Sequence, residues 1–126
     1  MQLEINGKIY DIRFTLGFLR EVNRSASQPL LLGVKGSDVA LGLKVYLTRV
    51  ASGDIDALAD LLMKANAQAD GEKLPRKELE AWIDSEDCNI DEVITQVYDA
   101  LESSNATKKT TRMTLTDLGI RKPEKK

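Results

Sequence analysis

The sequence predicts an α+β fold that is predominantly α-helical, with an N-terminal β-hairpin, about five helices and a flexible C-terminal tail. Asn6-Gly7 lies between two short β-prone runs, which is the strongest local signal for a two-residue hairpin turn. After the hairpin, apolar residues recur at helical spacing. The 126 residues, 42% hydrophobic and 30% charged, have the size and composition of one globular domain.

The hairpin turn fixes the strand register, with Ile5 opposite Lys8 and Leu3 opposite Tyr10. Alternation then puts a set of apolar residues on one face: Leu3, Ile5, Tyr10, Ile12 and Phe14. Because an isolated two-stranded hairpin is only marginally stable, this face must pack on helices or pair with another copy of the chain.

A first helix is expected from Thr15, its capping residue, to about Ser25. Its apolar stripe would consist of Leu16, Leu19 and Val22, with Phe18 beside it. The segment 26–36 contains a proline and two glycines and is predicted to be a loop.

A second helix is expected from Ser37 or Asp38 to near Gly53. Leu41 and Val45 lie beside its main stripe, so its apolar arc is wide. Such an arc indicates either a helix at the centre of the domain or a surface that contacts another protein.

Three further helices complete the domain, and each has a start or stop signal. They are expected from Asp54 or Asp56 to Asp70-Gly71, from Pro75 to about Ser85, and from near Ile90 to Ser104. In the middle one, Leu79, Trp82 and Ile83 form the apolar side. Trp82 is a core residue in one interpretation and an interface anchor in the other.

The charges are unevenly distributed along the chain. Residues 106–126 carry a net charge of +5, whereas the rest of the chain carries −7. We therefore predict a helical domain over residues 1–104 and a flexible basic tail over 105–126. Lys108, Lys109 and Arg112 are candidate partner-binding residues in the tail, as are Leu41, Val45 and Trp82 in the domain.

The residue types present argue against catalysis. The chain has no histidine, which removes the commonest general base and metal ligand. The single cysteine, Cys88, has no imidazole to activate it. The carboxylates between Asp84 and Glu92 fit a helix N-terminus better than a calcium loop. We expect no enzyme activity, metal or cofactor.

No stretch of the sequence has the length and hydrophobicity of a membrane span or the pattern of a secretory signal, so we expect a cytoplasmic protein. The segment Gly33 to Gly36 matches the GXXG loop that clamps nucleic-acid backbones. A small nucleic-acid-binding regulator that uses this loop and the basic tail is therefore an alternative function. The acidic body makes nucleic acid the less favoured partner.

Several stretches resemble one protein family. They are MQLEINGKIYDIRFTLGFLREVNR, GDIDALADLLMKAN, ELEAWIDSE and IDEVITQVYDALESSNATKK. In this order and spacing they resemble the tail assembly chaperones of phages with long, non-contractile tails that infect Gram-positive bacteria. The resemblance covers most of residues 1–109.

The resemblance implies a chaperone that binds the tape measure protein, keeps it soluble and helps recruit tail-tube subunits. It also implies a place in the host cytoplasm during infection and absence from the mature virion. We expect self-association as well, because many copies would coat one partner and the basic tail could contact the acidic body of the next copy. No binding residue is carried over from the family.

Overall fold

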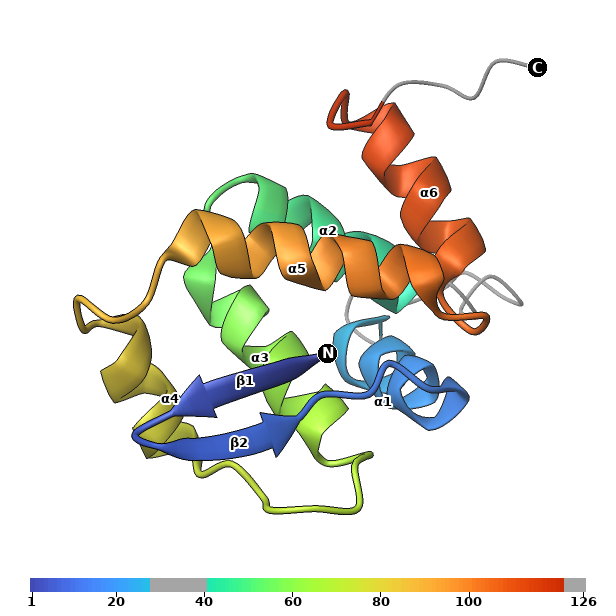
Figure 1. Ribbon diagram of the computed structural model, residues 1–126. Coiled ribbons are helices and arrows are strands. Elements are labelled where there is room, and N and C mark those ends of the chain that lie inside the picture. Colours follow the sequence, from blue (N-terminus) through green and yellow to red (C-terminus); the bar gives the residue numbers. More distant parts are fainter. Residues whose placement is uncertain (28–40, 122–126) are drawn as a thin grey trace.

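The computed structural model describes residues 1–27 and 41–121. Within them, a hairpin of β1 (Gln2–Ile5) and β2 (Lys8–Asp11) precedes six helices. The helices are α1 (Leu16–Ser27), α2 (Leu41–Ala51), α3 (Ile55–Asn66), α4 (Arg76–Ile83), α5 (Ile90–Ser103) and α6 (Lys108–Asp117). The predicted α+β fold, mainly helical and opened by a hairpin, is confirmed (Figure 1).

The hairpin has the predicted register, with Leu3 opposite Tyr10 and Ile5 opposite Lys8. Asn6 and Gly7 adopt φ angles of 55° and 80°, as a two-residue turn of this type requires. The predicted apolar face is buried in full: Leu3, Ile5, Tyr10, Ile12 and Phe14. It packs on helices, since β1 contacts α4 and the Arg13 amide donates to the Ala65 carbonyl of α3 at 3.1 Å.

Thr15 caps α1 as expected, because its hydroxyl accepts a hydrogen bond from the Phe18 amide at 3.2 Å. The predicted stripe of α1 was wrong at its first residue. Phe18 and Val22 are fully buried, whereas Leu16 is 56% exposed. Phe18 faces inward because its ring meets the ring of Phe14 edge to face, with centroids 4.9 Å apart.

The helix α2 contacts α1, α3 and α6, in agreement with the central position that its wide apolar arc indicated. It approaches α1 closely at Gly42, where a Cβ atom would lie 2.3 Å from the Cα of Asn23. The Asn23 side chain also accepts a hydrogen bond from the Leu43 amide at 3.1 Å. Glycine at this position therefore sets the distance between the two helices.

Side-chain caps begin two of the later helices. Asp54 accepts from the Ala57 amide at α3, and Asn89 accepts from the Glu92 amide at α5, both at 3.2 Å. The helix α3 ends at Asn66, before the predicted Asp70-Gly71 stop. The buried Asn66 side chain explains the early end, because it is bonded to the backbone of the segment that follows.

The helix α6 corrects the prediction of a flexible tail from residue 105 and raises the helix count above the predicted five. Thr111, Thr114 and Leu115 of α6 are buried against the body of the molecule. The prediction failed because threonines supply most of the buried face, so the sequence lacks an apolar stripe. The predicted loop of residues 26–36 was wrong at its first two residues, which belong to α1. Residues 28–36 lie outside the described part of the chain, as do residues 122–126.

Candidate functional site

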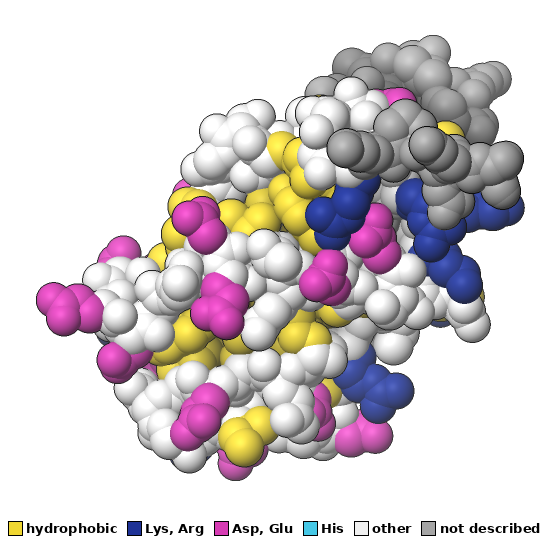
Figure 2. Space-filling model, turned by 45° about the horizontal axis from the view of Figure 1, so that its top comes forward, with side chains coloured by type: hydrophobic (Ala, Val, Ile, Leu, Met, Phe, Trp, Pro, Cys, Tyr) yellow, Lys and Arg dark blue, Asp and Glu magenta, His cyan; other side chains and the backbone are white. Residues whose placement is uncertain are grey.

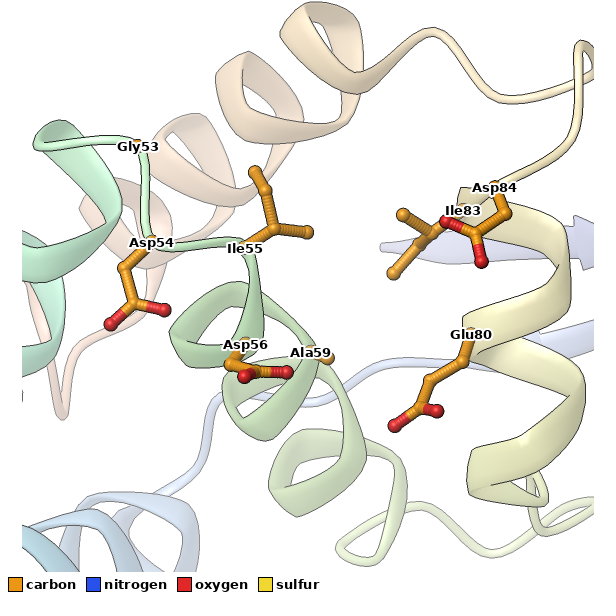
Figure 3. A pocket seen from close by; sticks show the side chains of 8 residues that line it. All are labelled: Gly53, Asp54, Ile55, Asp56, Ala59, Glu80, Ile83 and Asp84. Atoms are coloured by element: carbon orange, nitrogen blue, oxygen red, sulfur yellow. The ribbon is translucent and has the colours of Figure 1, made fainter.

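A hollow of about 450 Å³ lies between the start of α3 and the end of α4. Its lining combines aliphatic and acidic side chains: Gly53, Asp54, Ile55, Asp56, Ala59, Glu80, Ile83 and Asp84. Figure 3 shows Ile55 and Ile83 pointing toward each other across the opening. The carboxylates of Glu80 and Asp84 project from α4 toward the same space, whereas Asp54 points away from it. We call this feature the acidic hollow.

Arginine partly neutralises the carboxylates of the acidic hollow. Arg76 pairs with Glu80 at 2.9 Å and lies 3.8 Å from Asp56, and it also pairs with Asp60 of α3. Hydrogen bonds first to Asp60 and then to Glu80 raise the pKa of Arg76. This arginine therefore bridges α3 and α4 at a partly exposed position, where water and salt weaken its ion pairs. Among the ion pairs of the described residues, none includes Asp84.

The lining of the acidic hollow suits the binding of a long, positively charged side chain. Its aliphatic floor can contact the stem of a long side chain, and its unpaired carboxylate can meet a positive charge at the end of that stem. Within the described residues, no cluster of three or more potential metal-binding side chains occurs. Burial raises the pKa of the Cys88 thiol, so this cysteine is protonated at neutral pH.

A second charged feature is the basic face of α6, formed by Lys108, Lys109 and Arg112. All three side chains are exposed, and none forms an ion pair with another described residue. Figure 2 shows Lys and Arg gathered on one side of the molecule, with Asp and Glu spread over the rest of the visible surface. On the visible face, the basic side chains therefore lie apart from most of the carboxylates.

The structure does not bring the six predicted partner-binding residues to one place. Lys108, Lys109 and Arg112 lie together on α6. Trp82 lies on α4, half-buried and packed against the core, and Val45 is half-buried on α2. Leu41 begins α2, and its side chain is outside the described part of the structure. Of the predicted apolar side of α4, only Leu79 is fully buried. Trp82 and Ile83 are half-buried, and Ile83 lines the acidic hollow.

The acidic hollow could not be predicted from the sequence. Asp54 and Ile55 were interpreted as the start of one helix, and Ile83 and Asp84 as the end of another. Nothing in the spacing shows that these two helix ends meet. In the structure, α3 ends at Asn66 and the chain turns back, so that α4 lies beside α3.

Within the described residues, none of the helices has the length and hydrophobicity needed to cross a bilayer. Comparison with protein families gives a match to the model of the phage tail assembly chaperone protein TAC, over residues 2–114. The match therefore includes the hairpin, all of α1 to α5 and most of α6. Neither a curated protein nor a solved structure matches the chain.

Proposed function

The chain belongs to the phage tail assembly chaperone family, and from that premise we propose that it binds the tape measure protein and keeps it soluble until the tail tube forms. The observation that carries this proposal is the extent of the family match, which covers nearly the whole described fold. Membership in a chaperone family also favours a non-enzymatic role.

Two features of the surface support a role in protein binding. The acidic hollow offers aliphatic contact beside negative charge, and the basic face of α6 offers a separate positive surface. A long helical partner exposes apolar stripes flanked by charges, which suit surfaces of this kind. We propose that the acidic hollow contacts the tape measure protein, with Val45, Trp82 and Leu41 as further candidates for contact.

Further parts of the proposal concern the other partners and the place of action. The basic face of α6 is a candidate contact for the acidic body of another copy, so self-association should weaken at high salt. We further propose that the chain helps recruit tail-tube subunits, acts in the host cytoplasm and is absent from the mature virion. The nucleic-acid alternative gains no support, because the Gly33 to Gly36 loop lies outside the described residues.

Co-expression with the tape measure protein tests the proposal. We expect that protein to become soluble and to co-purify with the chain. In the variant Asp84→Lys, recovery of the tape measure protein should fall several-fold, because the charge at the acidic hollow is reversed. Lysine at the end of α4 is favourable for the helix dipole, so the fold should be retained.

The matched control is Asp87→Lys, which makes the same change at an exposed residue outside the lining of the acidic hollow. Recovery with this variant should equal that of the original chain. An equal loss with both variants would show that overall charge, and not the acidic hollow, controls binding. A tape measure protein that stays insoluble with the original chain would contradict the proposed function itself.

A further inference from the structure

The helix α6 differs from the other long helices in how it is held. Figure 1 shows it at one edge of the molecule, beside α5 and α2 and far from α4. It contacts α2 and α5. Of its three buried residues, two are threonines and only Leu115 is apolar. Leu115 belongs to the same buried cluster as Leu43 of α2 and Leu101 of α5.

The start of α6 lacks the signals that stabilise α3 and α5. Those helices have a side-chain cap and acidic residues in the first turn. At α6, Thr107 makes no capping bond, and its hydroxyl donates to the Leu101 carbonyl. Lys108 and Lys109 occupy the positive end of the helix dipole, where cations are unfavourable. A ten-residue helix of this kind is helical only because it is docked.

The docked face also contains an unsatisfied polar group. The Thr111 hydroxyl is fully buried and has no hydrogen-bond partner within residues 1–27 and 41–121. A buried hydroxyl without a partner opposes docking, because undocking returns it to water. Valine has the same shape without this cost. The surface of α2 and α5 beneath α6 therefore suits a helix with a more apolar face than that of α6.

The segment that follows α6 is held to α5 by ion pairs. Arg121 pairs with Asp99 at 3.1 Å and with Glu102 at 3.3 Å, both on α5. Its side chain is 33% exposed, so water and salt weaken these pairs. The helix α6 is thus held by the burial of Leu115 and two threonines, and by ion pairs of Arg121 that solvent weakens.

From these contacts we infer that the surface of α2 and α5 beneath α6 is a binding groove for an amphipathic helix of a protein partner, which α6 occupies until it is displaced. The incoming helix would carry apolar branched residues at the positions equivalent to Thr111, Thr114 and Leu115. This spacing of i, i+3 and i+4 is one face of a helix. That the partner is the tape measure protein rests on the proposed function. The existence of the groove rests only on the contacts of α6.

The direct test uses a labelled synthetic peptide of residues 106–121 carrying Thr111→Val and Thr114→Val. It should bind the full chain saturably, by replacing α6. A chain with Arg121→Ala should bind it about threefold more tightly, because α6 is released more easily. A chain with Thr111→Val should bind it about tenfold more weakly, because its own α6 no longer buries an unsatisfied hydroxyl.

Two matched controls accompany the test. The chain variant Thr110→Val makes the same substitution on α6 at a residue that is not fully buried, and it should leave peptide affinity within about twofold of the original. A peptide that also carries Leu115→Asp should not bind. Equal binding of both peptides, or no saturable binding by any chain, would overturn the inference. Conversion by the peptide of a dimer that high salt leaves intact into monomers would also overturn it, because the occupant would then be α6 of a second copy.

Hydrogen exchange provides an independent readout on the free, full-length chain. Amides of α6 should exchange at least about tenfold faster than those of Val97 and Leu101 in α5, because α6 opens without global unfolding. Exchange of both helices at one common rate would contradict a displaceable α6. The peptide and exchange measurements need no phage protein, so failure of tape measure binding would remove the proposed function and leave the groove in place.

Discussion

Asn66 joins three parts of the fold through one side chain. Its amide nitrogen donates to the Asp11 carbonyl at 3.0 Å and to the Glu72 carbonyl at 3.2 Å. Its oxygen accepts from the Leu74 amide at 2.7 Å. The Asn66 side chain is buried, so water cannot replace these bonds. They therefore satisfy backbone polar groups of β2 and of the segment before α4, and they join both to the end of α3.

Replacement of Asn66 by aspartate should lower the free energy of unfolding by about 2 to 4 kcal/mol. The variant keeps the shape of the side chain, but a carboxylate would face two carbonyl oxygens to which it cannot donate. Urea denaturation measures the change. The control Asn89→Asp makes the same substitution at an exposed N-cap, where aspartate is as good a cap, and should shift stability by less than about 0.5 kcal/mol. Equal effects at both positions would contradict this role of Asn66.

Asp54 links pH to stability. A hydrogen bond from Arg49, and then one from the Ala57 amide, lower the pKa of Asp54 below its ordinary value of 3.8. The stabilising contribution is therefore complete above that value and is lost as the pH falls through the lowered pKa of the folded state.

The variant Asp54→Asn tests this linkage, because asparagine keeps the cap but not the charge. It should be less stable than the original chain at neutral pH, and the difference in unfolding free energy should shrink below about pH 4. Denaturation at a series of pH values measures it. A difference that is independent of pH would rule out the ionised carboxylate as its cause.

At the scale of elements, the contact of α1 with α2 depends on Gly42. A methyl group there would collide with the backbone of Asn23, which cannot move aside as a flexible side chain can. Gly42→Ala should therefore destabilise the fold by about 2 to 3 kcal/mol, despite the better helix propensity of alanine.

The control for Gly42→Ala is Gly17→Ala in α1. A methyl group at Gly17 would meet only the end of the Gln68 side chain, which can move. Its cost should be smaller by at least about 1 kcal/mol, because the gain in helix propensity offsets it. Thermal or urea unfolding compares the two variants. If both lose the same stability, the close approach of the helices at Gly42 is not what limits substitution.

Elements with strong local signals could be predicted from the sequence, and those held by tertiary contacts could not. Asn6-Gly7 and Thr15 specify the hairpin and the start of α1 by local chemistry, and both were predicted correctly. The exposure of Leu16 and the helical state of α6 depend on neighbours that are distant in sequence. The same reason explains why the acidic hollow was missed, since α3 and α4 create it jointly.

At the scale of the whole molecule, the chain is a helical body with a basic face on α6, and Lys and Arg lie mainly on one side of the face that Figure 2 shows. Family membership covers this body from the first strand into α6. The acidic hollow and α6 lie at different ends of the fold, so two surfaces are available for different contacts (Figure 1).

Light scattering measures whether the chain prevents aggregation of the tape measure protein, when that protein is denatured and then diluted into buffer with increasing amounts of the purified chain. If the chain covers the apolar stripes of that protein, scattering should fall as the chain is added and reach a plateau at a fixed number of chains per tape measure protein. Scattering that is the same with the chain and with an equal mass of an unrelated acidic protein would show that the chain does not cover these stripes.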